Sequence, residues 1–271
     1  MLIGNKLFKI GERTYIMGIL NVTPDSFSDG GRYINTAEAL QHAREMVENG
    51  ADILDIGGES TRPGHVPVSK DEEVSRVVHI IRAIRKEIGV PLSIDTYKAE
   101  VAEEAIKAGA VMINDVWGFK KDPDMAAVAA KYDVACCLMH NQDKPEYGNL
   151  IEDITSAFRE SVEIALKKGV KKDKIILDPG VGFGKTYEHN LEVLRNLQYF
   201  SKIGFPILLG TSRKSVVGNA LKLPVDQRKE GTLATSVIGI SKGIDFVRVH
   251  DVIENKRACK MADIIYRSIS K

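Results

Sequence analysis

Short apolar runs alternate with amphipathic segments along the whole chain. The runs are short and rich in Val, Ile and Leu, as is typical of strands, whereas the segments between them repeat apolar residues at helical spacing. After Ser69, one such stripe consists of Val74, Val77, Val78, Ile81, Ile84 and Ile88. The pattern predicts eight strand-then-helix units, with strands in residues 15–20, 52–57, 91–95, 111–115, 134–140, 174–178, 206–210 and 245–250.

Capping residues mark the ends of several predicted helices. Ser69 and Glu72 have the spacing of a capping box at a helix start. Asp122-Pro123 and Asp251 indicate the starts of two others. Glycines follow five helices where a left-handed residue can end them, at Gly50, Gly89, Gly109, Gly169 and Gly243.

The number and type of strands predict the fold. Eight parallel strands close into a barrel, and near-continuous apolar strands suit a sheet that is buried on both faces. An open doubly wound sheet would need a Gly-rich turn after the first strand, where the chain has Asn21-Val22-Thr23-Pro24 instead. We predict an α/β protein with one (β/α)8 TIM-barrel domain over residues 1–271, in which residues 1–12 form a plug or hairpin across the bottom.

Composition narrows the class of protein. The chain has 271 residues, of which 44% are hydrophobic and 28% are charged, as in ordinary globular proteins. Lys+Arg 38 and Asp+Glu 37 nearly cancel, so no overall charge favours nucleic acid or a membrane surface. No apolar run reaches the roughly 18 residues needed to cross a bilayer, and the charged N-terminus is unlike a secretory signal. Cys136, Cys137 and Cys259 are expected to be reduced core thiols of a cytoplasmic protein.

Polar residues follow or end seven of the eight predicted strands. In a (β/α)8 barrel the active site is built at the carboxyl ends of the strands, so these side chains should meet at one mouth. Buried carboxylates there need a partner or a ligand, because burying them unpaired is costly. The polar residues are Asn21, Glu59, Ser60, Thr61, Arg62, Asp95, Asn114, Asp115, Asp178, Ser212, Arg213, Lys214, Ser215, Arg248 and His250.

The types of these residues indicate a ligand. Asp95, Asn114 and Asp178 suit a flat heterocycle with adjacent N–H donors, such as an aminopyrimidinone edge. Donors for phosphate are supplied by Thr61, Arg62, Arg248 and His250.

The same set of residues bears on metal binding. Without a large cluster of histidines, a catalytic zinc or a binuclear metal site is disfavoured. Asn21 can give Mg²⁺ one protein oxygen while phosphates and water complete its octahedron. The residues therefore predict a site for a heterocycle, phosphates and magnesium.

Each candidate also has a structural interpretation. Asp95 and Asp178 could cap the helices that follow them, although Pro179 makes Asp178 an awkward cap. Asn114 alone would be a turn residue, and His250 alone a structural histidine. Their shared place at the barrel mouth favours a function for Asp95, Asn114 and Asp178. For His250, a function is favoured by Arg248 beside it.

The glycine-rich segment 180–185 invites a phosphate-binding interpretation. It lacks the spacing of a Walker motif, and no Ser or Thr follows Lys185 in the required pattern. We expect its glycines to let the backbone pass close under a ligand at the mouth.

Eight sequence motifs lie at the strand ends, in order over nearly the whole chain. They are MGILNVTPDSFSDGG, DIGGESTRPG, SIDTYKAEV, INDVWG, LMH, LDPGVGFGK, GTSRKS and RVHDV. These motifs resemble those of the dihydropteroate synthase family, with one small departure at Ala99, where many relatives carry Pro. The resemblance implies condensation of 4-aminobenzoate with 6-hydroxymethyl-7,8-dihydropterin diphosphate in folate biosynthesis, with release of pyrophosphate and inhibition by sulfonamides.

The resemblance also implies individual roles. Asn21 matches the magnesium ligand, while Phe27, Pro63 and Ser215 match the walls of the aminobenzoate pocket. Asp95, Asp178, Lys214 and Arg248 are the residues expected to act in catalysis. The contacts to the pterin and its diphosphate match Thr61, Asp95, Asn114, Asp178, Lys214, Arg248 and His250.

The expected chemistry is a dissociative substitution. A pterin ring conjugated to the departing methylene can stabilise a cation, helped by Asp95 and Asp178. Mg²⁺ on Asn21, with Arg248, His250 and Thr61, would offset charge on the leaving pyrophosphate.

Two overlong loops, residues 21–33 and 59–67, are expected to fold over the mouth once pterin diphosphate is bound. Phe27 is an isolated aromatic in the first of them. It would then find its apolar partner in the aminobenzoate ring.

Three other functions share some of these residues. A methyltransferase using methyltetrahydrofolate would not need the phosphate donors, and an aldolase would place its Schiff-base lysine within a strand, whereas Lys185 and Lys214 lie beyond strand ends. A non-catalytic pterin-binding protein would be expected to have lost parts of the site. A homodimer is predicted from apolar residues near the C-terminus (Met261, Ile264 and Ile265) and from the resemblance, because members of the family usually form dimers.

Overall fold

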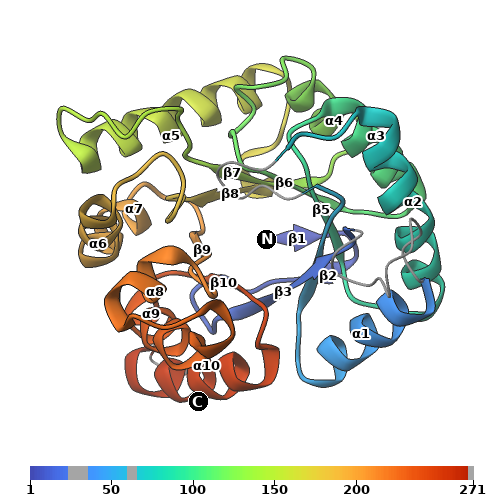
Figure 1. Cartoon of the computed structure of the whole chain (residues 1–271). Helices are drawn as coiled ribbons and strands as arrows, with labels where there is room; N and C mark the ends of the chain where they lie inside the picture. Colours follow the sequence, from blue (N-terminus) through green and yellow to red (C-terminus); the bar gives the residue numbers. More distant parts are fainter. Residues whose placement is uncertain (24–35, 60–65, 268–271) are drawn as a thin grey trace.

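The computed structural model describes residues 1–23, 36–59 and 66–267 of the chain, which form the predicted (β/α)8 barrel (Figure 1). Within those residues, eight parallel strands neighbour one another in the order β8-β7-β6-β5-β4-β3-β10-β9. A parallel bridge between Leu177 and Ile207 closes the ring between β8 and β9. The strands are β3 (Tyr15–Asn21), β4 (Ile53–Gly57), β5 (Leu92–Asp95), β6 (Met112–Asp115), β7 (Ala135–Met139), β8 (Ile175–Asp178), β9 (Leu208–Leu209) and β10 (Phe246–Val249).

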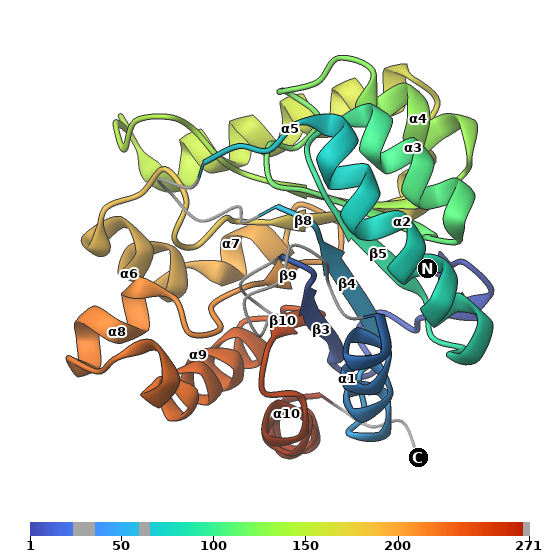
Figure 2. The same ribbon diagram turned by 45° about the vertical axis from the view of Figure 1, so that its right-hand side comes forward.

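Helices surround the strands as an outer ring (Figures 1 and 2). Two helices follow β8 and two follow β9, whereas the sequence pattern predicted one helix after each strand. The helices are α1 (Thr36–Glu48), α2 (Lys70–Glu87), α3 (Ala99–Ala108), α4 (Met125–Lys131), α5 (Leu150–Lys167), α6 (Tyr187–Arg195), α7 (Leu197–Ser201), α8 (Ser215–Leu221), α9 (Lys229–Ser241) and α10 (Val252–Tyr266).

Most predicted helix ends are confirmed. Ser69 caps α2 by accepting a hydrogen bond from the Glu72 N–H, and Asp251 stands at the start of α10. Two details were wrong: α2 ends in extended backbone at Ile88, so Gly89 is not left-handed, and α4 begins after Asp124 instead of Asp122-Pro123. The predicted left-handed glycines are confirmed at Gly50, Gly109, Gly169 and Gly243.

Side chains of the strands pack in two separate hydrophobic cores, one between the sheet and the helices and one inside the barrel. Leu54 and Ile56 of β4 pack in the large cluster between sheet and helices, whereas Ile53 packs inside the barrel. The predicted plug is confirmed: β1 (Leu2–Ile3) and β2 (Lys6–Leu7) form an antiparallel hairpin. Its buried Ile3 and Phe8 belong to the interior cluster, so the amino-terminal end of the barrel is closed by apolar side chains.

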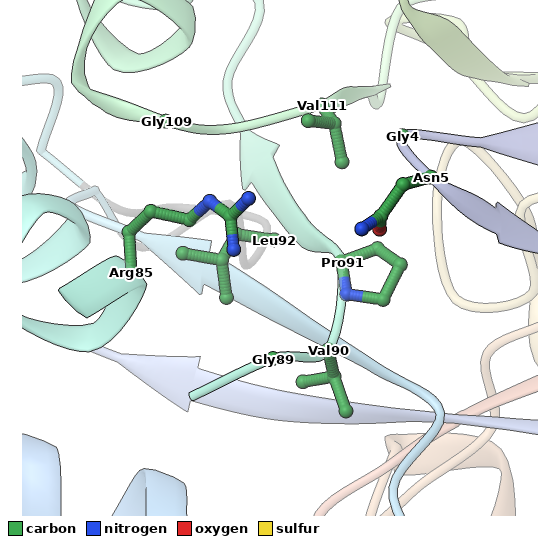
Figure 3. Close-up of a pocket in the computed structure, with 9 residues that line it drawn as sticks. All are labelled: Gly4, Asn5, Arg85, Gly89, Val90, Pro91, Leu92, Gly109 and Val111. Atoms are coloured by element: carbon green, nitrogen blue, oxygen red, sulfur yellow. The ribbon is translucent and has the colours of Figure 1, made fainter. Parts of the chain in front are cut away.

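A pocket of about 240 Å³ lies beside this hairpin (Figure 3). Gly4 and Asn5 of the hairpin turn border it, together with Arg85 near the end of α2. Pro91 and Val111 precede β5 and β6, so the pocket is at the opposite end of the strands from the predicted site. Among the described residues, none of the helices has both the length and the apolar character needed to cross a membrane.

Candidate active site

A layer of four polar side chains lies inside the described part of the barrel. Asp55, Asn114, Asp178 and Arg248 come from β4, β6, β8 and β10, which are alternate strands of the ring. Each stands two residues after an apolar interior residue (Ile53, Met112, Ile176 and Phe246) and so faces the same way. Alternate strands of such barrels contribute side chains to one layer, so the interior changes here from apolar to polar.

Arg248 lies at the centre of this layer. Its Nε donates to Asp55 Oδ2 and its Nη2 donates to Asp95 Oδ2, each over 2.6 Å. Asn114 Nδ2 donates to the same Asp55 oxygen over 3.0 Å. Three predicted site residues are therefore brought together: Arg248 contacts Asp95 directly and is linked to Asn114 through Asp55. Asp55 was missed in the sequence analysis because only the ends of strands were considered. An acid within an otherwise apolar strand could have identified it.

Burial and ion pairing shift the pKa values of this network in opposite directions. Burial raises the pKa of Asp95 to about 7, although Arg248 acts in the other direction. For Arg248, burial lowers the pKa, but Asp55 and Asp95 outweigh it and raise the pKa above its ordinary value. The guanidinium therefore stays charged, whereas Asp95 can change its charge near neutral pH.

Asp178 and Lys214 form a second group at the mouth. Asp178 Oδ1 accepts from the Gly180 N–H over 2.8 Å, and burial raises its pKa against the opposing effect of Lys214. Lys214 Nζ donates to the Val181 carbonyl over 2.6 Å. Burial lowers the pKa of Lys214 to about 8, although Asp178 opposes this.

The segment 180–185 is held by Lys185. Its Nζ contacts His140 Nδ1 at 2.8 Å and donates to the carbonyls of Gly180 and Phe183 over 3.0 and 3.1 Å. Burial lowers the pKa of Lys185 to about 7 and that of His140 to about 2, so the neutral imidazole accepts from the lysine. Phe183, which the sequence analysis did not single out, has its ring 4.6 Å from Lys214 Nζ.

The glycines of this segment make close contacts, but with protein. A side chain at Gly180 would meet the His140 carbonyl at 2.0 Å, and one at Gly184 would meet the Gln142 carbonyl at 2.4 Å. These contacts explain why Gly180 and Gly184 carry no side chain, and the expected passage of the segment under a ligand stays a prediction. Both glycines let the segment pack against the end of β7.

The residues after β9 and β10 approach one another. Ser212 Oγ lies 2.9 Å from His250 Nδ1 and accepts from the His250 N–H over 3.1 Å. Arg213 is engaged by Asp251, with Nη2 to Oδ1 at 2.6 Å. Ser215 is exposed at the start of α8, directly after Lys214.

Asn21 and Asp95 flank one small space. A Cβ at Gly57, which pairs with both residues across the sheet, would lie 3.7 Å from Asn21 Oδ1 and 3.8 Å from Asp95 Oδ2. These are oxygen donors of the kind Mg²⁺ prefers. No three acidic, His or Cys side chains among the described residues gather as a metal cluster. The Asn21 carboxamide oxygen therefore has the chemistry of a Mg²⁺ ligand.

Five predicted residues, Phe27, Ser60, Thr61, Arg62 and Pro63, lie outside the described residues. Glu59, which precedes four of them, accepts from the Tyr97 hydroxyl over 2.9 Å and from the Val68 N–H over 3.2 Å. Glu59 therefore joins the end of β4 to residues on the far side of segment 60–65.

The fold and the site together define a class of protein, a (β/α)8-barrel enzyme that binds a flat polar ligand at its mouth. A family model described as pterin binding enzyme matches residues 17–250. A dihydropteroate synthase from Clostridium beijerinckii is 65% identical over 98% of this chain and 100% of its own length. The Bacillus subtilis dihydropteroate synthase is 58% identical over 93% of this chain and 88% of its own.

Solved structures agree with this result. One is a dihydropteroate synthase from Clostridium difficile, determined in the presence of pteroic acid, with a TM-score of 0.95 and 58% identity over 97% of this chain and 100% of that one. Another is the Yersinia pestis dihydropteroate synthase in a sulfonamide drug complex, with a TM-score of 0.91 and 42% identity over 98% of both chains. The chain belongs to the family of pterin-binding enzymes and, within it, to the dihydropteroate synthases, which are transferases.

Proposed function

We propose that this enzyme condenses 4-aminobenzoate with (7,8-dihydropterin-6-yl)methyl diphosphate to give 7,8-dihydropteroate and pyrophosphate. The observation that carries the proposal is the group formed at the barrel mouth by buried Asp95, Asn114 and Asp178 with the partly buried Arg248. It presents acceptors for ring N–H donors beside a cation. Because relatives were solved with pteroic acid and with a sulfonamide, the same site also takes sulfonamide inhibitors.

The pterin ring occupies the polar layer. Asp178 accepts from two adjacent ring donors, as an ionised carboxylate can. Asn114 and Asp95 bind the far edge of the ring. Lys214, 3.6 Å from the Cβ position of Gly210, donates to the ring carbonyl.

The diphosphate lies toward β3 and β10. Arg248 and His250 offer donors to it, and Thr61 and Arg62 are its further donors. Asn21 holds Mg²⁺ through its carboxamide oxygen. When bound, this ion would supply charge stabilisation of the leaving pyrophosphate.

The second substrate lies outside the pterin. Ser215 and Lys214 hold its carboxylate, and Phe27 and Pro63 contact its ring. Phe183 adds an apolar surface next to Lys214.

The residues of the chain favour a dissociative substitution. Asp95 and Asp178 stabilise positive charge that spreads over the pterin ring as its bond to the diphosphate breaks. Arg248 and His250 stabilise the departing pyrophosphate. The arylamine attacks as a neutral group and loses its proton afterwards, so no strong general base is needed.

A coupled assay of pyrophosphate release tests this function. Release should require pterin diphosphate and 4-aminobenzoate together, and a chelator of Mg²⁺ should abolish it. Binding of 4-aminobenzoate alone should be weak and should strengthen when pyrophosphate is added. Release at the full rate without the arylamine would contradict the proposal.

Assembly and location are part of the proposal. Met261, Ile264 and Ile265 of α10 are more than half exposed, which supports a homodimer through this face. Cys136, Cys137 and Cys259 are buried and unpaired, as suits a reducing cytoplasm.

A further inference from the structure

Asp55 is a buried carboxylate to which the mechanism above gives no role. It lies in the middle of β4 and its side chain is 0% exposed. One of its oxygens, Oδ2, accepts from Arg248 Nε over 2.6 Å and from Asn114 Nδ2 over 3.0 Å. In the described part of the chain, its other oxygen has no hydrogen-bond partner. A carboxylate in this setting is costly to bury, so it requires an explanation.

The strand order explains how one side chain reaches both partners. Around the barrel the strands follow the order β6-β5-β4-β3-β10, so Asn114 and Arg248 lie two strands to either side of Asp55. Because all three side chains belong to the same interior layer, Asp55 connects opposite walls of the site.

These contacts fix the orientation of both partners. Asn114 gives one hydrogen of its amide nitrogen to Asp55, which leaves its oxygen and its second hydrogen for a ligand. Arg248 gives Nε to Asp55 and Nη2 to Asp95, so two carboxylates hold the plane of its guanidinium.

Asp52, three residues earlier, shows what a structural carboxylate does in this region. It binds Arg13 over 2.7 Å and accepts from the Ile16 N–H over 3.0 Å near the bottom of the barrel. Among the residues that the structure describes, its other partners are Lys6 and Lys256, so it contacts no residue of the site. Asp55 contacts two residues of the site, Asn114 and Arg248.

We propose that Asp55 is a positioning residue for the synthase reaction, which holds Arg248 and Asn114 in the orientations that bind pterin diphosphate. The inference rests on the proposed function, in which those two residues touch the substrate. Asp55 itself acts through them.

Two substitutions test it. Asp55→Asn keeps the shape and removes the charge, whereas Asp55→Glu keeps the charge and moves the carboxylate. Each should weaken pterin binding and lower kcat/KM for pterin diphosphate by about tenfold or more, with the KM for 4-aminobenzoate within about twofold of wild type. The matched control, Asp52→Asn, should lower the melting temperature and leave pterin affinity within about twofold.

A double-mutant cycle separates positioning from a general effect. In an Arg248→Gln background, Asp55→Asn should cost less than it does in the wild type, because one of its two partners is already gone. Additive losses, or a folded Asp55 variant with affinity and kcat/KM within threefold of wild type, would overturn the proposal. Failure of both variants to fold while Asn114→Ala folds would assign Asp55 to stability and would also overturn it. If the Asn114→Ala and Arg248→Gln variants bind pterin as tightly as the wild type, these two residues do not contact the substrate. The proposed function, and not the role of Asp55, is then contradicted.

Discussion

At the scale of single residues, the charge of Asp95 depends on two opposing effects, its burial and its pairing with Arg248. Asp95 is 3% exposed and bonded to Arg248, yet its Oδ1 has no hydrogen-bond partner among the described residues. Burial therefore outweighs the guanidinium and places its pKa at about 7. A substrate with ring donors would supply the missing partners and favour the ionised form.

Pterin affinity should consequently depend on pH. The carboxylate of Asp95, which faces Arg248 and Asp55, accepts protons as the pH falls through about 7, and the protonated form is a poorer acceptor. Calorimetry with a pterin should show binding weaken by about tenfold from pH 8 to pH 6. Asp95→Asn should bind weakly at both values. Equal wild-type affinity at both would show that Asp95 does not bind the ring in its ionised form.

Asp178 gives a second prediction about pterin binding. Asp178→Asn replaces one acceptor by a donor, which cannot satisfy two adjacent ring donors. Pterin binding should weaken by roughly 2–4 kcal/mol, as when a charged hydrogen-bonded pair is broken. Isothermal titration checks this, and a loss well under 1 kcal/mol, about threefold, would move Asp178 out of the pterin site.

At the level of elements, the loop after β8 is shaped by backbone packing. Gly180 has φ 67°, and its Cα lies against the His140 carbonyl at the end of β7. Lys185 then bonds that loop at Gly180 and Phe183, and Val181 holds Lys214. The position of Lys214 thus depends on a close approach between two loops.

Gly180→Ala should disturb this arrangement. The new methyl group would lie 2.0 Å from the His140 carbonyl, so the loop has to move. We expect a loss in the free energy of unfolding above the roughly 1–3 kcal/mol of left-handed strain, and a raised KM for 4-aminobenzoate. Gly204→Ala is the control, because Gly204 has φ 91° but no heavy atom within 4 Å of the added Cβ. Equal urea denaturation of the two variants would exclude the steric effect.

The elements were largely predictable, and the site only in part. Strands buried on both faces leave apolar runs that the sequence shows directly, so all eight were found. Asp55 was missed because it lies inside a strand, where its partners come from β6 and β10 and only the closed barrel brings them together. Phe183 was missed for a similar reason, since its neighbour Lys214 is distant in sequence.

At the scale of the whole molecule, the two ends of the barrel differ: one is closed by apolar side chains and the other carries the polar site. The hairpin closes the bottom with Phe8, whose ring lies 4.7 Å from Tyr15 and 6.0 Å from Phe246. The mouth keeps its polar layer directly above that core. Helices α9 and α10 lie side by side on the outer surface (Figure 2). Their exposed apolar residues, which we call the α9–α10 patch, are Ile238, Met261, Ile264, Ile265 and Tyr266, all 45–60% exposed.

A second copy of the chain is the proposed partner of the α9–α10 patch, so a charge there should prevent dimer formation. Burying one isoleucine contributes about 1.5–3 kcal/mol, and a carboxylate at the centre of an apolar interface would be left unpaired. Wild-type protein should sediment as a dimer and Ile264→Glu as a folded monomer. Leu7→Glu is the matched control: Leu7 is 62% exposed but lies on the hairpin at the bottom of the barrel, so this variant should remain a dimer. A monomeric wild type, or an Ile264→Glu variant that still sediments as a dimer, would show that this surface does not join two copies.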